Sequence, residues 1–338
     1  MSKTVKLADI AERAGVSIVS VSKALAGKKG VSEEMRRRIR DIADELGYKQ
    51  PSAIAGVTAF EGYSLGVLIH DMYLGKYDSF YLHMYQVLST RATSRGAVTM
   101  LETINDGMIE ASVLPKIVED GRASGIIIIG KTDPDYIEKI RERAHVPLLF
   151  LDFCTDNSEA DAVISDGFYG AYYMTNYLWD MGHRDIAFVG SINANGSIMD
   201  RYLGYLKSMS EHGADTSRLK RYEDRTSDGV VSDSVMKLKK NNLPTAFFCN
   251  CDLTAACLIR KLEGMGYKIP EDISVAGFDN YLVPGSCDVA VTSYEIDVRG
   301  MADRAVDTII SKIKGEPYAG GVHSISGHMV IKDSVAEL

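Results

Sequence analysis

The chain has few cysteines, and their spacing fits no zinc site. Only five of its 338 residues are cysteines, and no C-x-x-C pair occurs. An odd number of scattered thiols is typical of free cysteines in a reducing compartment, where disulfides are rare. We therefore expect free thiols and no bound metal at Cys154, Cys249, Cys251, Cys257 and Cys287.

Long hydrophobic runs are also missing. The four isoleucines at residues 126–129 are enough for a buried strand, whereas a helix that spans a bilayer needs about 20 apolar residues. The first residues, MSKTVKLADIAERAG, are charged and amphipathic and lack the apolar segment of a signal peptide. We expect a cytoplasmic protein with no membrane contact.

We find no group of residues typical of a catalytic or cofactor site. No HExxH motif occurs, and the seven histidines do not pair at metal-binding spacing. GMGYKI, at 264–269, lacks the third glycine of a dinucleotide-binding loop and follows an expected helix. His183 is expected to order a helix-to-strand turn. We therefore expect no nucleophile elbow, no phosphate-binding loop, no cofactor and no enzymatic activity.

Positive charge is scarce overall but gathers at one end of the chain. The net charge is −8, yet residues 1–58 hold 11 Lys and Arg against 7 Asp and Glu, while the rest holds 27 against 39. A basic head on an acidic body indicates nucleic acid as the partner of the head. At 338 residues, the chain is long enough for two or three soluble domains.

The basic head is predicted to form three short helices. In LADIAERA, at 7–14, the apolar residues fall on one face, and Gly15 ends the helix because glycine adopts the left-handed conformation without strain. Ser17 is expected to cap the second helix and Ser32 the third. The apolar stripe of the third helix consists of Met35, Ile39, Ile42 and Leu46.

The second helix, in SIVSVSKALAG, combines apolar and polar residues on its open face. At 100° per residue, Val21 and Leu25 point toward the other two helices, whereas Val19 and Lys23 point away and Ile18 lies in the exposed first turn. Ile and Val can pack on thymine methyl groups, and Lys can reach a base edge or a phosphate. Two helices joined by a tight turn, the second entering the major groove, form a helix-turn-helix. The alternative is that Ile18 and Val19 belong to the core of a small helical domain.

The segment VKLADIAERAGVSIVSVSKALAGKKGVSEEMRRRIRDIADELGY resembles the N-terminal domain of the LacI/GalR family of bacterial transcriptional repressors. The matching motifs are DIAERAGVS, the VS-K of the second helix, GVSEE-R and ELGY. The resemblance implies base contacts from Ile18, Val19 and Lys23. It implies phosphate contacts from Ser20, Ser22 and Ser32.

The segment that follows departs from the family pattern. YKQPSAIAGVTAFEG has one extra residue before Pro51 and places Gly56 and Thr58 where the family has the Arg and Leu of a hinge helix. Threonine is too small to replace a leucine wedge in the minor groove. Ile54 or Val57 would then supply the wedge, and we take Ile54 as the DNA contact; the alternative is a smaller bend in the DNA.

Strands and helices alternate from Ser64 onward, which predicts parallel sheets covered on both faces. So many strands indicate two sheets with a ligand-binding cleft between two lobes. Helices are expected at 78–96, 108–121, 134–143, 252–266 and 298–314, in FYGAYYMTNYLWDMG and in DRYLGYLKSMSEHG; strands are expected at 64–70, 97–103, 125–130, 146–152, 161–166, 185–190, 245–250 and 273–279. We expect an α/β fold: an all-α helix-turn-helix head at 1–49, a hinge at 50–62, and at 63–338 a two-lobed core of doubly wound parallel sheets that binds the effector and dimerises.

WDMGHRDIAFVG, MDRYLGYLKSM, AFFCNCDLTA and IPEDISVAGFDN resemble the effector-binding core of the same family, which is itself similar to periplasmic sugar-binding proteins. The resemblance implies ligand contacts from Phe80, Tyr81, Asp152, Arg201, Cys251 and Asp279. Cys251 stands where the family has Asn, and a thiol is a weak donor and a poor acceptor, so we expect one polar ligand contact to be lost unless Asn250 replaces it. The alternative roles are loop caps for the two aspartates and a structural ion pair for Arg201.

Carboxylates, an arginine and aromatic rings suit a carbohydrate. The sequence thus predicts a homodimeric repressor that binds a palindromic double-stranded DNA operator under the control of a small molecule, with a sugar as the favoured ligand. Within the family, the alternative is a corepressor-dependent regulator that responds to a purine or to a phosphoprotein. Other classes are a solute-binding receptor, which would need a signal peptide, and an α/β enzyme, which would need a catalytic cluster. No heptad follows KDSVAEL, which favours a dimer over a tetramer.

Overall fold

The computed structural model describes residues 7–25, 31–46, 62–74, 79–156 and 160–338. The chain divides into two compact units, Met1–Glu61 and Gly62–Leu338. Ile54, Gly56, Val57 and Thr58 of the expected hinge lie outside the described residues.

The first unit contains the three expected helices, α1 (Leu7–Ala14), α2 (Ile18–Leu25) and α3 (Glu33–Glu45). Their inward faces meet in a small core whose fully buried members include Ile10, Val21 and Ile39. Gly15, with a φ of +70°, ends α1. The backbone N–H of Ser20 donates to Ser17 Oγ at 3.1 Å, and that of Met35 donates to Ser32 Oγ at 3.3 Å, so both predicted N-caps are confirmed.

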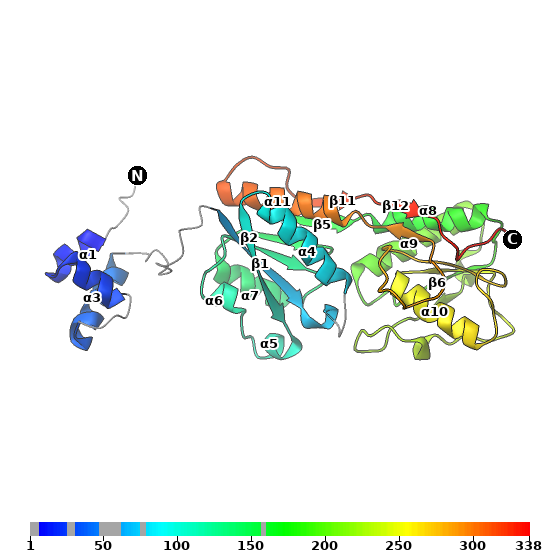
Figure 1. Cartoon of the computed structure of the whole chain (residues 1–338), viewed down its shortest axis with the longest axis horizontal. Coiled ribbons are helices and arrows are strands. Elements are labelled where there is room, and N and C mark those ends of the chain that lie inside the picture. Colours follow the sequence, from blue (N-terminus) through cyan, green and yellow to red (C-terminus); the bar gives the residue numbers. More distant parts are fainter. Residues whose placement is uncertain (1–6, 26–30, 47–61, 75–78, 157–159) are drawn as a thin grey trace. The chain divides into compact units, whose positions relative to one another are not determined.

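The first lobe of the second unit is built on a six-stranded parallel sheet in the order β11-β5-β4-β3-β1-β2 (Figure 1). Its strands are β1 (Tyr63–His70), β2 (Ala97–Ile104), β3 (Gly125–Ile129), β4 (Leu148–Leu151), β5 (Ala162–Ser165) and β11 (Val322–Ile325).

Helices cover both faces of this sheet, as the continuous apolar strands predict. Ile127 and Ile129 of β3 pack with α4 (Phe80–Thr93) and α11 (Val298–Lys314) on one face. Ile126 and Ile128 pack on the other face with α6 (Lys116–Glu119) and α7 (Pro134–Ala144). Figure 1 shows α4 and α11 together and α6 and α7 across the sheet from them.

The second lobe has a four-stranded parallel sheet in the order β7-β6-β8-β9. Its elements are β6 (Ile186–Val189), β7 (Arg221–Tyr222), β8 (Ala246–Cys249), β9 (Ser274–Ala276), α8 (Gly167–Asp180), α9 (Gly196–Glu211) and α10 (Asp252–Gly264). The helices α8 and α9 share one buried cluster with Phe188 and Phe248, and α10 shares another with Phe247 on the opposite face. An antiparallel pair, β10 (Ser293–Glu295) with β12 (His328–Val330), also belongs to this lobe.

The chain crosses between the lobes at three places. It passes from β5 to α8, returns before α11, and after β11 enters the second lobe again. The C-terminal segment is fixed there, because the N–H of Leu338 donates to the carbonyl of Met181 at 2.8 Å. Connections between two lobes are the segments that take up a change in the angle between them, where such a change occurs.

One predicted helix is wrong. The range 108–121 forms two short helices, α5 (Asp106–Glu110) and α6, because Pro115 cannot donate a backbone hydrogen bond and disfavours helical backbone in the residue before it. The other predicted helices and strands are confirmed to within a few residues. Strands β7, β10, β11 and β12 and the 3₁₀ turns η1 (Asp71–Tyr73), η2 (Thr216–Arg218) and η3 (Asp233–Val235) were not predicted.

Two further expectations concern single residues. All five cysteines are free, as predicted. His183 joins the turn after α8 to two other segments, because its ring nitrogens lie 3.0 Å from Thr245 Oγ1 and 3.2 Å from the carbonyl of Ala336. In the described part of the chain, every helix is too short or too polar to cross a bilayer.

Candidate functional site

The outer face of α2 exposes apolar side chains. Ile18 is 51% and Val19 63% exposed, and Ser22 and Lys23 are exposed beside them, while Ser20 is half-buried. Ile18 and Val19 are therefore not part of the core of the first unit, and that alternative is wrong. An exposed β-branched pair beside a lysine can contact thymine methyl groups and base edges in a major groove.

The inner face of α2 points toward the other two helices, as predicted. Val21 is fully buried and the half-buried Leu25 packs against the same core, and Ala24, which we did not assign, is fully buried beside them. Arg36 of α3 is itself buried and donates from Nη1 to the carbonyl of Ala24 at 3.3 Å. This bond fixes the last turn of α2 on α3 and so sets the orientation of the exposed face.

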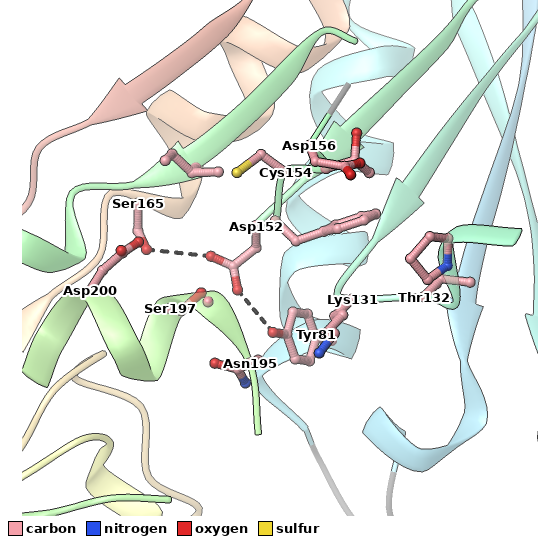
Figure 2. A pocket seen from close by; sticks show the side chains of 15 residues that line it. Tyr81, Lys131, Thr132, Asp152, Cys154, Asp156, Ser165, Asn195, Ser197 and Asp200 are labelled. Carbon is pink, nitrogen blue, oxygen red and sulfur yellow. Dashed lines mark hydrogen bonds between the residues drawn. The ribbon is translucent and has the colours of Figure 1, made fainter. Parts of the chain in front are cut away.

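The second unit contains a cavity of about 260 Å³, lined by residues from both lobes, which we call the interlobe cavity. The first lobe contributes loops at the carboxyl ends of β3 and β4, the end of β5, and Tyr81 of α4. The second lobe contributes the start of α9 (Figure 2). This is the place where doubly wound folds bind ligands. Its lining residues are Tyr81, Lys131, Thr132, Pro134, Asp152, Phe153, Cys154, Thr155, Asp156, Ile164, Ser165, Asn195, Gly196, Ser197 and Asp200.

Asp152 lies at the centre of the first-lobe side of this cavity. Its Oδ2 accepts a hydrogen bond from the Tyr81 hydroxyl at 2.9 Å, and its Oδ1 accepts one from Ser165 Oγ at 3.4 Å (Figure 2). Its backbone has a φ of +65°, a left-handed conformation that Asp tolerates better than most residues. The structure thus brings the predicted residues Tyr81 and Asp152 together.

Arg201 lies on α9, whose first turn is capped by Asn195. Its side chain is buried, donates from Nη1 to the carbonyl of Asn250 at 2.6 Å, and stacks its guanidinium 4.0 Å from the ring centre of Phe278. Arg201 does not line the interlobe cavity directly, and its effect there is on the pKa of the lining residue Asp152.

Electrostatics joins Arg201 to two more of the predicted residues. Burial raises the pKa values of Asp152 and Asp279, and the positive charge of Arg201 lowers both. Asp279 has a left-handed backbone, with a φ of +89°, and lies near Asp252, whose negative charge raises its pKa further. Burial also raises the pKa of Asp252, to about 7, although Ser293 Oγ donates to its Oδ1 at 2.7 Å. Arg201 is therefore shared by carboxylates from both lobes.

Two of the predicted ligand residues line a different cavity. Phe80 and Asp279 border a space of about 480 Å³, together with His83, Tyr281 and the chain crossings before α11 and after β11. The ring centres of Phe80 and Tyr281 are 5.9 Å apart, and those of His83 and Tyr281 are 5.5 Å apart. Consecutive residues of α4 point in different directions, so Tyr81 faces the interlobe cavity and Phe80 does not.

Cys251 is buried and lines neither cavity. Its Sγ lies 3.2 Å from Thr254 Oγ1 and 3.8 Å from Arg225 Nη2, and burial raises its pKa to about 11, so the thiol is protonated at neutral pH. Asn250 donates from Nδ2 to Asp224 at 2.7 Å and to the carbonyl of Val189 at 3.0 Å. Its amide group is therefore engaged inside the lobe.

Arg225 is a residue that the sequence did not point to. Its side chain is 16% exposed, and Nη1 donates to the fully buried Asp224 at 2.9 Å. Its positive charge lowers the pKa of Tyr73, and Tyr81 in turn raises the pKa of Arg225. The guanidinium therefore lies near the aromatic residues of the first lobe. The loop EDRTSDG offers no pattern that would have indicated this position.

Two stretches carry the letters of catalytic motifs, although we expected none from the sequence. GIIIIGKT, at 125–132, matches a phosphate-binding loop, but its four isoleucines form the buried strand β3 and leave no loop to surround a phosphate. GYSLG, at 62–66, matches a nucleophile elbow, but Ser64 lies inside β1 and not at a strand-to-helix turn. Neither stretch has the structure that its motif requires.

Comparisons with known proteins agree with this arrangement. The model of the bacterial regulatory proteins of the lacI family matches residues 6–51, and the model of the periplasmic binding protein-like domain matches residues 175–335. Among curated proteins, the HTH-type transcriptional repressor PurR of Vibrio campbellii is 24% identical over 340 residues, covering 98% of each chain. The PurR repressor of Glaesserella parasuis is 25% identical over 338 residues, also covering 98% of each.

Solved structures share the fold over nearly the whole chain. A complex of the transcriptional regulator CelR with cellobiose has a TM-score of 0.70 at 21% identity, covering 98% of this chain and 99% of that one. The lac repressor dimer bound to operator and the anti-inducer ONPF has a TM-score of 0.69 at 22% identity, covering 99% and 100%. The predicted fold, a helix-turn-helix head and a two-lobed core of parallel sheets, is thereby confirmed. The chain therefore contains a DNA-binding domain of the lacI family of bacterial regulatory proteins, followed by a periplasmic binding protein-like domain.

Proposed function

We propose that this protein is a sequence-specific transcriptional repressor whose affinity for its DNA operator is controlled by a small molecule bound in the interlobe cavity. The observation that carries the proposal is the exposed face of α2, where Ile18, Val19 and Lys23 have no internal role in a basic head. Ser20, Ser22 and Ser32 would contact phosphates, and Ile54 would enter the minor groove. We also propose a cytoplasmic location and no enzymatic activity.

A homodimer suits this function. One recognition helix reads too few bases for a unique site, and a two-fold pair reads a palindrome. A ligand that contacts both lobes stabilises one angle between them. If that angle determines the separation of the two DNA-binding heads, ligand binding shifts the population between forms with high and low operator affinity.

The lining of the interlobe cavity supports a carbohydrate as the ligand. Carboxylates and hydroxyl groups can bond the hydroxyls of a sugar, and the rings of Tyr81 and Phe153 offer apolar faces. At about 260 Å³ the cavity is just below the usual range for small-molecule sites, which favours a ligand of one or two rings. Relatives of this fold include the CelR–cellobiose complex and a regulator from Enterococcus faecium with bound ribose.

A purine is the second candidate. The curated relatives named PurR support it, at 22–25% identity over nearly the whole chain. Aromatic rings can also stack on a base, and the carboxyl group of Asp152 can accept from a ring N–H. The two candidates are distinguished by which free ligand, a sugar or a purine, stabilises the protein.

Two measurements test the proposal. Selection from random duplex DNA, followed by a gel-shift assay, should enrich palindromes, and their binding should weaken steeply with salt. A thermal-shift screen of sugars and nucleobases should then find a ligand that adds about 2.7 kcal/mol of stability at a hundred times its Kd and changes operator affinity. Equal binding to random duplex would disprove the DNA function. If only purines stabilise the protein, the proposed ligand is a purine and not a sugar.

A further inference from the structure

The interlobe cavity has an excess of negative charge. Asp152, Asp156 and Asp200 line it, and Lys131 is the one cationic side chain among the lining residues. The buried Arg201 does not line the cavity, but its positive charge lowers the pKa values of both Asp152 and Asp200. Three carboxylates therefore face one cation inside the cavity and one behind it.

Two of these carboxylates come from opposite lobes. Asp152 follows β4 in the first lobe, and Asp200 lies in α9 in the second. The charge of Asp200 also contributes to the raised pKa of Cys154, which lies in the first-lobe loop after β4. A single positive group between Asp152 and Asp200 would therefore connect the two lobes (Figure 2).

The charges already present do not compensate these carboxyl groups. Burial raises the pKa values of Asp152 and Asp200, and the opposing effect of Arg201 is not sufficient to restore either to its ordinary value. Asp166 raises the pKa of Asp200 further. A cation placed in the cavity would favour the ionised form of both groups.

An independent feature of the cavity indicates a polar ligand. Thr132 lines it and is 4% exposed, yet its Oγ1 has no hydrogen-bond partner. Buried hydroxyl groups nearly always have a partner, and an orphan in a binding cavity is available to a ligand. Thr132 belongs to the first lobe, as do Asp152 and Ser165, whereas Asn195 and Ser197 face them from the second.

We propose that the effector carries a positively charged amino group, which makes amino sugars the ligand class that fits the cavity. The ammonium group bridges Asp152 and Asp200, and the hydroxyl groups of the ring bond Thr132 and Ser165. This inference rests on the proposed function and narrows its ligand. Because charge-assisted hydrogen bonds are about twice as strong as neutral ones, the bridge would contribute strongly to closing the lobes.

The test uses the full-length protein and six probes: D-glucosamine, D-galactosamine and D-mannosamine, each with its neutral parent sugar. Calorimetry is performed at about pH 6, where the amines are protonated. At least one amino sugar should bind about tenfold or more tightly than its parent, and N-acetylation, which removes the charge, should abolish the advantage. Asp200→Asn should reduce the ratio between amino sugar and parent, whereas Asp180→Asn, an exposed charge change on α8 in the same lobe, should leave it unchanged.

The outcomes separate this inference from the function beneath it. The proposal of a charged amino group is wrong if a neutral sugar binds as tightly as its amino sugar or more tightly. It is also wrong if the preference for the amine survives Asp200→Asn. In both cases the repressor function stands. The same proposal is wrong if none of the six probes binds and a nucleobase does. Failure of the protein to prefer any palindromic DNA overturns the function itself, whichever sugar binds.

Discussion

The hydroxyl group of Tyr81, on the first turn of α4, donates a 2.9 Å hydrogen bond to Oδ2 of Asp152, at the end of β4. The two residues are 71 positions apart in the chain and meet at the wall of the interlobe cavity. Burial and the charge of Asp152 raise the pKa of Tyr81 well above its ordinary value, so the phenol remains a donor at every physiological pH. This bond orients the carboxyl group of Asp152 at the wall of the interlobe cavity.

Replacing Tyr81 by Phe should weaken both folding and ligand binding. The variant loses a hydrogen bond to a charged group, worth about 1.5–3 kcal/mol, and leaves the carboxylate of Asp152 with fewer donors. Tyr85→Phe is the matched control on the same helix, because that hydroxyl pairs with the neutral Thr99 Oγ1 at 3.3 Å and should contribute about 0.5–1.5 kcal/mol. Urea denaturation measures both variants. Equal losses would show that the Asp152 contact has no special role.

The stability of the core should decrease as the pH rises toward neutrality. The folded-state pKa of Asp252 is about 7, above that of a carboxyl group in an unfolded chain, so the folded protein binds more protons than the unfolded one. Stability is then fully present below about pH 4 and is lost progressively up to about pH 7. Asp252→Asn should reduce this slope and raise the free energy of unfolding at pH 8 by an amount on the order of 1–4 kcal/mol, while the other carboxyl groups with raised pKa values, Asp152, Asp200 and Asp279, retain their part of it. Asp180→Asn should retain the slope. An unchanged slope in Asp252→Asn would contradict the assignment.

Substitutions on the exposed face of α2 should affect DNA binding and leave the fold intact. Val19→Ala should lose about 1–3 kcal/mol for the selected palindrome and relax the preference at one base position. Lys23→Ala should either do the same or, if Lys23 binds phosphate, reduce the salt dependence of log K by about one unit. Arg13→Ala removes an equal charge from the head, in an exposed pair with Glu45 at 3.0 Å, and should change affinity little. A similar loss in all three variants would point to general charge instead of this face.

Gly204 should tolerate no side chain, because α8 and α9 approach each other closely there. A Cβ at this position would lie 2.0 Å from the carbonyl oxygen of Phe168. Gly204→Ala should destabilise the core by about 1–3 kcal/mol or more, despite the better helix propensity of alanine. Gly264→Ala is the control: apart from its chain neighbours and the backbone of its own helix, no heavy atom lies within 4 Å of an added Cβ, so the change should be neutral or stabilise by up to about 1 kcal/mol. Thermal melting of the two variants should therefore move in opposite directions or differ clearly in size.

Much of the fold could be predicted from local patterns. Ser17, Ser32 and Gly15 mark helix ends by chemistry that acts within one turn, and the apolar runs at 126–129 and 246–249 report strands buried on both faces. The open face of α2 followed from the helical period alone, and Ile18 and Val19 are indeed exposed. Leu25 packs against the core as predicted, and Ala24, which we did not assign, is buried beside it, because a projection at fixed angles does not include the size and position of the facing helix.

The candidate site could be predicted only in part. Tyr81, Asp152 and Arg201 were recognised through the family resemblance, and in the structure Tyr81 donates to Asp152 and the charge of Arg201 lowers the pKa of Asp152. Sequence could not show that Phe80 faces another cavity than its neighbour Tyr81, nor that Arg225 reaches the position beside Cys251. The sequence did not indicate Thr132, because only the positions of the surrounding atoms show that its hydroxyl group has no hydrogen-bond partner.

By itself, then, the sequence determined most of the helices and the longer strands, their buried faces and the basic character of the head, since these depend on residues within a few positions of one another. Tertiary structure alone decided which loops meet across the two lobes. β11 joins the first sheet beside β5 from nearly 160 residues away, and Asp152 and Asp200 face one cavity from different lobes. Contacts of that kind depend on packing between distant segments, and no local pattern of residue types encodes them.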